Sequence, residues 1–222
     1  MSEPTLIVVR NEVNPESEYH CDALESLVPN ARALNFPTGE RPDLESADGV
    51  VLTGSTAGVY ERAKHPWIDD QLVLVQELVE REIPALGVCF GHQVANAALG
   101  GTVEAQETTC RPVEMAVEDG EPLFDGVSPI VPVAHGDVVT EVGDGMEVIA
   151  SSDYYHAFAT RHRDAPLWTV QFHPEFTSEL RERLEADFGW TEDEYGFEDV
   201  TAARVVENFA SMVAGNMGTT RP

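Results

Sequence analysis

The chain has 222 residues, of which 42% are hydrophobic, and its 40 acidic residues face only 13 basic ones, giving a formal net charge of −27. This length and apolar content suffice for one substantial core, and no Gly/Ser/Pro-rich linker divides the sequence, so we predict a single domain over residues 1–222. The composition excludes a basic nucleic-acid-binding face, because few cations are present to neutralise phosphates, and every apolar run is too short to cross a membrane.

The acidic excess also predicts how the protein responds to salt. At 0.1 M salt the Debye length is about 10 Å and at 1 M about 3 Å, so repulsion between surface carboxylates is largely screened in concentrated salt. The composition resembles that of cytoplasmic proteins from salt-accumulating halophiles. Three scattered cysteines and no hydrophobic signal segment indicate a reduced, cytoplasmic environment. We therefore expect a cytoplasmic protein whose folding and activity require high salt.

Apolar runs and helical periodicity alternate in the first hundred residues. The runs are continuous rather than alternating, which favours strands covered on both faces in a parallel sheet. They fall at residues 5–9, 49–52 and 83–88. Apolar side chains that recur every three or four positions predict a helix over residues 68–81. A second helix is expected to begin at Phe90 and to end at Gly100-Gly101.

The second half of the chain is richer in strands. Shorter strands are predicted at residues 111–117, 130–133, 146–150 and 156–160, followed by an apolar run at 167–173 and a last helix near 201–214. Strands and helices that alternate around a strand-rich middle predict an α/β fold: a three-layer, doubly wound, mostly parallel sheet with an antiparallel strand extension.

The most informative motif, Gly87-Val88-Cys89-Phe90-Gly91, lies where the third apolar run meets a helix. A turn this sharp projects one side chain above the sheet, and glycines two positions before and after it let backbone layers approach closely. The helix N-terminus turns free N–H groups toward the sulfur, which favours the thiolate. We predict that Cys89 is a nucleophile for acyl transfer. The alternative is a buried packing role, which we assign to Cys21 and Cys110.

A proton shuttle for this thiolate is predicted at His173-Pro174-Glu175, at the end of the run 167–173. Residues two apart in extended chain share a face, and Pro174 biases His173 toward that conformation. Glu175 can then fix the tautomer of the imidazole, which gives a nucleophile, a base and an orienting carboxylate in chain order. The alternative is a solvated histidine and glutamate beside an ordinary turn proline.

A further strand end completes the predicted chemistry, because the run 49–52 leads into Thr53-Gly54-Ser55. If this strand lies beside the one that precedes Cys89, the backbone N–H groups of Gly54 and Phe90 provide two donors of an oxyanion hole. Each such donor contributes roughly 3 to 4 kcal/mol of transition-state stabilisation in a dry site. Without that neighbour, Gly54 is an ordinary turn glycine.

With these residues in view, the chain resembles the class I (triad-type) glutamine amidotransferases. The resemblance rests on the strand at 5–9, Thr53-Gly54-Ser55, residues 87–93, Ala134-His135-Gly136-Asp137 and His173-Pro174-Glu175. It implies a flavodoxin-like sheet and the Cys-His-Glu triad. It also implies that Gln93 contacts bound glutamine, and that Gly136 and Asp137 form a loop whose backbone holds the substrate's amino-acid end. On the residues alone, Gln93 only occupies the first turns of a helix, His92 packs nearby, and His-Gly-Asp is an ordinary turn.

Two features bear on the subfamily. The His135-Gly136-Asp137 segment looks most like the glutaminase domain of GMP synthase, but Ala134 stands where a serine is common in that domain. An acidic insertion at about residues 176–196 precedes the last helix. Such an insertion also occurs in free-standing amidotransferase-like proteins and γ-glutamyl peptidases, which the chain likewise resembles.

The resemblance implies hydrolysis of glutamine to glutamate and ammonia through a cysteine thioester. The ammonia would pass to a separate synthetase, such as the ATP-pyrophosphatase subunit of GMP synthase in purine biosynthesis. Neither a P-loop nor a Ser-Gly-Gly-x-Asp-Ser signature occurs, so ATP and Mg²⁺ are expected on the partner and no cofactor in this chain. Cysteines and histidines lack zinc-like spacing, so no metal site is expected. Two alternatives stay open: a free-standing γ-glutamyl hydrolase or peptidase, and a non-catalytic binding or regulatory subunit.

Overall fold

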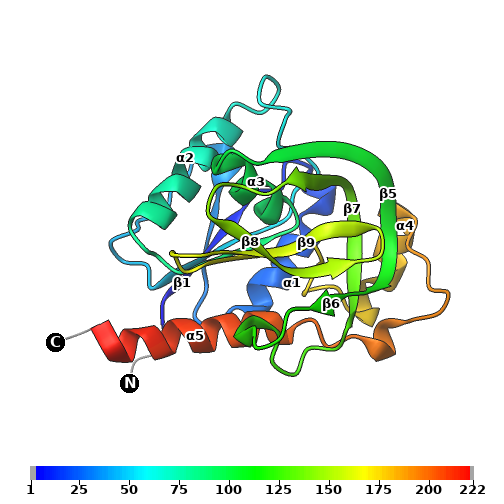
Figure 1. Cartoon of the computed structure of the whole chain (residues 1–222). Helices are drawn as coiled ribbons and strands as arrows, with labels where there is room; N and C mark the ends of the chain where they lie inside the picture. Colours follow the sequence, from blue (N-terminus) through cyan, green and yellow to red (C-terminus); the bar gives the residue numbers. More distant parts are fainter. Residues whose placement is uncertain (1–3, 221–222) are drawn as a thin grey trace.

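A mostly parallel sheet runs through the middle of the computed structural model, which describes residues 4–220, with the backbone alone for 216–220 (Figure 1). Within those residues, eight strands form this sheet in the order β2-β1-β3-β4-β10-β9-β8-β6. Its parallel strands are β1 (Leu6–Arg10), β2 (Arg32–Asn35), β3 (Gly49–Leu52), β4 (Ala85–Val88) and β10 (Leu167–Val170). The chain leaves β1 for β2 on one side and returns to β3 on the other, so a topological switch point lies between β1 and β3.

Helices cover both faces of the sheet, as the continuous apolar runs predict. Alternate residues of β1 point to opposite faces: Leu6 and Val8 pack in one core, and Ile7 and Val9 in the other. The first core is closed by α1 (Tyr19–Leu27) and α5 (Arg204–Thr220), and the second by α2 (Trp67–Glu80) and α3 (Phe90–Ala98). The three-layer, doubly wound α/β fold is therefore confirmed.

The predicted antiparallel extension is also present. It consists of β10, β9 (Tyr155–His162), β8 (Met146–Ser152) and the short β6 (Ala116–Val117), paired antiparallel in that order. The strand predicted at 111–117 is wrong in one respect, because it is divided between two sheets. Met115 interrupts it, and the residues before Met115 belong to a different pairing.

That pairing is a long two-stranded ribbon of β5 (Thr102–Glu114) and β7 (Ile130–Glu141), which curves along one side of the molecule in Figure 1. The expectation of a loop at Gly136 and Asp137 is therefore wrong: both lie within β7. Antiparallel pairing with β5 keeps this polar segment extended, with a register shift between Ala105 and Thr109 opposite it. The shift leaves residues 106–108 beside Gly136, where Thr108 is the nearest side chain.

The predicted insertion holds a helix, α4 (Arg181–Phe188), followed by a connection that leads to α5. It has a small apolar core of its own, separate from the two sheet faces, formed by Cys110, Phe176, Leu184, Trp190 and Phe197. The acidic segment is therefore tied to β5 through Cys110 and to the end of the β10 connection through Phe176. No helix within the described residues combines the length and the apolar character needed to span a bilayer.

Candidate active site

Cys89 occupies a strained turn between β4 and α3. Its backbone has φ +52° and ψ −104°, a region that residues other than glycine rarely adopt. The flanking glycines explain why the turn is tolerated: a Cβ on Gly87 would lie 2.5 Å from the Gly91 carbonyl oxygen, and one on Gly91 would lie 2.5 Å from that of Leu52. The geometry is that of the predicted nucleophile elbow, with the Cys89 side chain at a cavity and the first N–H groups of α3 beside it.

His173 and Glu175 form a buried pair beyond the end of β10. The His173 Nδ1 atom lies 2.7 Å from Glu175 Oε1, and both side chains are at most 5% exposed. The His173 backbone N–H donates to the Pro132 carbonyl of β7, which fixes the segment. The His173 Nε2 atom lies 3.3 Å from the Ala134 carbonyl oxygen, and Cys89 Sγ lies 3.9 Å from the same oxygen. Thiol and imidazole therefore converge on one point of β7.

The pKa of His173 is set by this burial and by its two neighbours. Burial alone would lower it, but the Glu175 carboxylate and the Cys89 sulfur hold the pKa well above its usual value. An imidazole with such a pKa accepts a proton readily from a neighbouring thiol, which favours a thiolate–imidazolium pair.

Gly54 lies where the predicted groups meet. Strands β3 and β4 are paired in parallel, so the strand that leads to Gly54 is a neighbour of the strand that leads to Cys89, as the oxyanion hypothesis required. A Cβ built on Gly54 would lie 3.2 Å from Cε1 of His173 and 3.6 Å from Cβ of Cys89. A larger residue here would press on both side chains.

A cavity of about 350 Å³ opens above these residues. Gln93 and the β7 segment Gly136-Asp137 line it, together with Tyr60, whose hydroxyl donates to Asp137 Oδ1 at 2.9 Å. The Gln93 side-chain amide donates to the Asp137 carbonyl oxygen at 3.3 Å, which ties α3 to β7. The structure thus brings Gln93, Gly136 and Asp137 to the same cavity as Cys89 and His173.

Two other histidines near the cavity have structural partners on both ring nitrogens. His92 lies between the hydroxyls of Thr169 and Tyr155, and burial, with His135 nearby, lowers its pKa to about 3. His135 contacts the Asp137 carbonyl and the Tyr154 hydroxyl, and burial lowers its pKa to about 4. Both rings are neutral at pH 7, and the packing role expected for His92 is what the structure shows.

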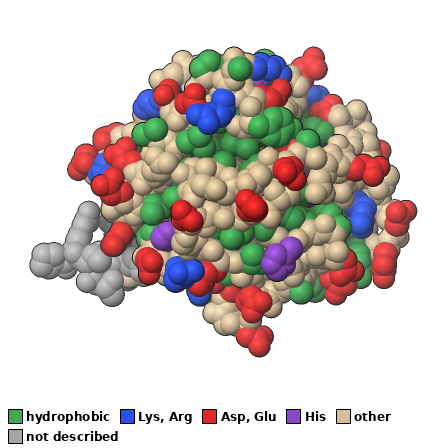
Figure 2. Space-filling model, turned by 45° about the horizontal axis from the view of Figure 1, so that its top comes forward, with side chains coloured by type: hydrophobic (Ala, Val, Ile, Leu, Met, Phe, Trp, Pro, Cys, Tyr) green, Lys and Arg blue, Asp and Glu red, His purple; other side chains and the backbone are tan. Residues whose placement is uncertain are grey.

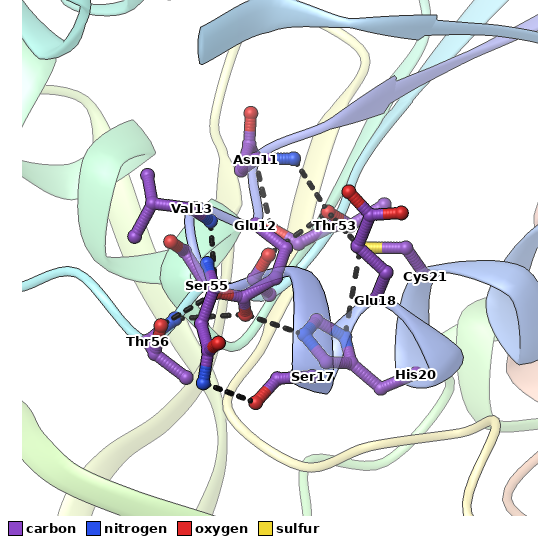
Figure 3. A network of polar contacts seen from close by, with 12 residues as sticks. Asn11, Glu12, Val13, Ser17, Glu18, His20, Cys21, Thr53, Ser55 and Thr56 are labelled. Atoms are coloured by element: carbon purple, nitrogen blue, oxygen red, sulfur yellow. Dashed lines mark hydrogen bonds and ion pairs between the residues drawn. The ribbon is translucent and has the colours of Figure 1, made fainter.

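Sequence reasoning missed a second buried pair, Glu12 and His20. His20 Nε2 lies 2.8 Å from Glu12 Oε2, and the two side chains are 5% and 1% exposed. Figure 3 shows this pair within a network of polar contacts that joins the segment after β1 to the segment after β3. His20 also lines the cavity, with its Cε1 atom 3.4 Å from a Cβ built on Gly54. The one available signal was that Glu12 follows a parallel strand at the switch point, where ligand sites form.

Comparison with known proteins agrees with this site. Residues 18–190, which include the elbow and His173, match the family described as glutamine amidotransferase class-I. The chain belongs to the class-I glutamine amidotransferase family. It is an amidotransferase in sequence as well as in fold, so the expected family and activity class are confirmed.

Relatives of this amidotransferase include proteins of two lengths. A glutamine-hydrolysing GMP synthase subunit of Methanothermobacter thermautotrophicus is 31% identical over 152 residues, covering 67% of this chain and 74% of the relative. The glutamine-hydrolysing GMP synthase of Lactobacillus delbrueckii is 29% identical over 195 residues, covering 82% of this chain but only 36% of that longer protein. The amidotransferase thus spans about a third of the longer relative.

The solved structures agree on the fold. A glutamine amidotransferase from Thermotoga maritima superposes with a TM-score of 0.70 at 21% sequence identity, covering 97% of this chain and 96% of the other. The chain therefore shares its overall fold with this amidotransferase structure.

Proposed function

We propose that the amidotransferase hydrolyses glutamine with Cys89 as nucleophile, His173 as general base and acid, and Glu175 as the residue that orients His173. One observation carries this assignment: the strained Cys89 and the paired His173 both lie against Ala134 and Gly54 at the edge of one cavity. The backbone N–H groups of Gly54 and Phe90 are the proposed donors to the oxyanion. Phe90 is suited to this role because it begins α3, where the N–H has no acceptor within the helix.

The reaction follows from these positions. His173 takes the thiol proton, and the Cys89 sulfur attacks the side-chain carboxamide carbon of glutamine, whose oxygen becomes negatively charged. The carbon–nitrogen bond then breaks as His173 gives its proton to the nitrogen, which leaves as ammonia. A water molecule, deprotonated by His173, attacks the thioester carbon. The carbon–sulfur bond breaks, which releases glutamate and restores the thiol.

Gln93, Gly136 and Asp137, which line the same cavity as Cys89, are proposed to hold the amino-acid end of glutamine. Asp137 is well placed for this because Tyr60 fixes one carboxylate oxygen through a hydrogen bond. The Asp137 carbonyl is fixed by Gln93 and His135. A rigid anionic wall fits the α-ammonium group of an amino acid.

The ammonia is proposed to pass to a separate synthetase subunit of GMP synthase, which would bind ATP, Mg²⁺ and the acceptor. Two relatives support this: one is named as a single subunit of a glutamine-hydrolysing GMP synthase, and the other is a GMP synthase of greater length. The amidotransferase itself is proposed to need no cofactor or metal, because every step above uses its own side chains.

The test has two parts. First, glutaminase activity is measured in concentrated salt with and without an added ATP-pyrophosphatase partner together with its nucleotides; a weak basal rate that rises on addition supports the proposal. Efficient cleavage of γ-glutamyl peptides without a partner would favour a free-standing γ-glutamyl hydrolase instead. Second, a diazo-ketone analogue of glutamine is added and the adduct is located by mass spectrometry. The absence of an adduct on Cys89 in folded protein would favour a non-catalytic subunit.

A further inference from the structure

Glu12 joins the two backbone segments that border the oxyanion position. Its carboxylate accepts from the backbone N–H groups of Val13 at 2.8 Å and Asn14 at 2.7 Å, both after β1. It also accepts from the backbone N–H and the hydroxyl of Thr56, after β3. Burial alone would raise the pKa of Glu12, but the His20 contact and these hydrogen bonds hold it below its usual value. Glu12 is therefore a fixed anion that holds the Gly54 segment against β1.

His20 stands between this anion and the cavity. Its Nε2 contacts Glu12 and its Nδ1 lies 3.7 Å from Cys21 Sγ, so neither nitrogen is left to exchange a proton with a substrate. The carbon edge, Cε1, is turned toward Gly54. The ring meets His173 edge to face, with centroids 6.1 Å apart and planes at 80°.

The charge on this ring is set by buried neighbours. Burial alone would lower the pKa of His20, but contacts with Cys21 and Glu12 raise it to about 10, so the ring is cationic at pH 7. The titratable groups that face it are Glu12 after β1, Tyr19 and Cys21 on α1, Cys89 after β4, and His173 and Glu175 after β10. A surface ion pair would be screened in concentrated salt, whereas this pair is buried and is screened much less.

We propose that Glu12 and His20 are positioning residues that fix the Gly54 segment and place the imidazolium of a buried ion pair behind the oxyanion hole. This inference rests on the proposed function of the site, because the charge acts on the oxygen that becomes negative when Cys89 attacks. His20 acts through space and through Gly54 rather than by proton transfer, since both of its nitrogens are engaged. A buried ion pair is costly to form, so its placement against the reacting groups fits a role in the reaction better than one in stability alone.

The first experiment separates kcat from KM. His20→Gln removes the charge and keeps a side-chain amide that can donate to Glu12. We expect kcat to fall about tenfold to a hundredfold, comparable with the loss of part of an oxyanion hole, while KM for glutamine stays within about twofold. His162→Gln, a change at a histidine that lies outside this cavity, serves as the matched control and should leave both constants unchanged. An unaltered kcat in folded His20→Gln would overturn the proposal.

The second experiment uses pH to separate electrostatic from structural effects. Glu12→Gln leaves His20 buried without its anion, so the pKa of His20 should fall and the ring should lose its charge within the assay range. The ratio of wild-type to variant kcat should then increase from pH 6 to pH 9, by about tenfold if the charge is fully lost. Glu12→Asp keeps the carboxylate and should keep the wild-type pH profile. A Glu12→Gln ratio that stays constant with pH would show a purely structural role and contradict the proposal.

A third measurement does not depend on glutaminase activity. Alkylation of Cys89 by anionic iodoacetate and by neutral iodoacetamide is followed by mass spectrometry in wild type and in His20→Gln. A positive charge near the sulfur favours the anion, so the iodoacetate-to-iodoacetamide rate ratio should fall about threefold or more in the variant. An unchanged ratio would overturn the charge assignment. A wild type without glutaminase activity would instead overturn the proposed function, so the two failures are distinguishable.

Discussion

The ring of His173 lies flat against the ring of Phe176, with centroids 4.1 Å apart and planes 4° from parallel. Glu175 holds one edge of the imidazole, and Phe176 holds one face, so the proposed base is fixed in two directions. The stack also connects the site to the acidic insertion, because Phe176 packs edge to face on Trp190, which stacks on Phe197.

Phe176→Leu is expected to lower kcat while leaving KM for glutamine nearly unchanged. Leucine keeps the apolar volume but loses the aromatic face, which is worth roughly 0.5 to 1.5 kcal/mol, so kcat should fall about three- to tenfold. The matched control is Phe197→Leu, which removes a ring from the same cluster without touching His173. The measurement is steady-state kinetics of both variants in high salt. Equal kcat values for the two variants would show that the stacking of Phe176 on His173 has no part in catalysis.

The backbone conformation of Cys89 predicts that Cys89→Gly is more stable than Cys89→Ala, the reverse of the usual order for these two residues. Alanine normally gives a more stable protein than glycine, by about 0.5 to 1 kcal/mol. At φ +52° the order should reverse, because glycine relieves a strain of about 1 to 3 kcal/mol that alanine keeps. Urea unfolding at constant high salt should therefore find Cys89→Gly more stable than Cys89→Ala. Both should lack glutaminase activity, and an Ala variant that is the more stable would argue against strain at the elbow.

Asp137 is expected to determine the affinity for glutamine. Burial raises the pKa of its carboxyl above the usual value, against the hydrogen bond from Tyr60, which lowers it. Asp137→Asn keeps the shape and removes the charge, so KM should rise about tenfold or more, as for the loss of a charge-assisted bond worth roughly 1.5 to 3 kcal/mol. Tyr60→Phe should have a smaller effect, because the carboxylate remains. If Asp137→Asn changed kcat but not KM, Asp137 would not hold the amino-acid end.

Sequence patterns predict an element well when residues within that element determine its structure, and poorly when contacts with a distant segment determine it. The strand at 49–52 and the helix at 68–81 were predicted to within one residue, because a continuous apolar run and a single amphipathic face each determine them. The elbow is equally local: two glycines and a cysteine within five residues define it. In contrast, β7 was predicted to end at Val133, eight residues early. Its second half is polar and is extended only because an equally polar part of β5 pairs with it.

The Glu12–His20 pair could not be predicted from the sequence. Neither residue is part of a recognisable motif, and the segment between them contains no repeated pattern. Their contact arises because α1 returns over the end of β1, and their relevance arises because β3 brings Thr56 and Gly54 to the same place. Contacts of this kind depend on the packing of several elements and become visible only in three dimensions.

The same pair predicts how stability varies with alkaline pH. The pKa of His20 rises on folding from about 6.5 to about 10, so its contribution to the free energy of unfolding is complete below pH 6.5 and is lost as pH rises toward 10. The difference in unfolding free energy between wild type and His20→Gln should therefore shrink across this interval. Urea titrations at several pH values and constant salt provide the measurement, and a difference that stays constant between pH 7 and pH 10 would mean that His20 is neutral in the folded protein.

Salt is expected to govern the folding of the whole chain. Acidic side chains are scattered over the face shown in Figure 2, where basic ones are sparser, and the net charge is −27. Because the Debye length falls from about 10 Å to about 3 Å between 0.1 M and 1 M salt, the thermal midpoint should rise steeply over this range. Circular dichroism and glutaminase assays across a potassium chloride series test this. A full circular-dichroism signal and full activity in dilute buffer would contradict it.

The proposed nucleophile, the proposed base and the proposed oxyanion donors all follow the carboxyl ends of three adjacent central strands, β3, β4 and β10. In the proposed mechanism, every side chain that forms or breaks a bond belongs to this one chain. Covalent fusion to a synthetase, or separation from it, would then leave these residues in place, and a partner would act on their rate and on the route by which the released ammonia travels. A unit of this kind would suit a separate subunit and a fused domain equally well.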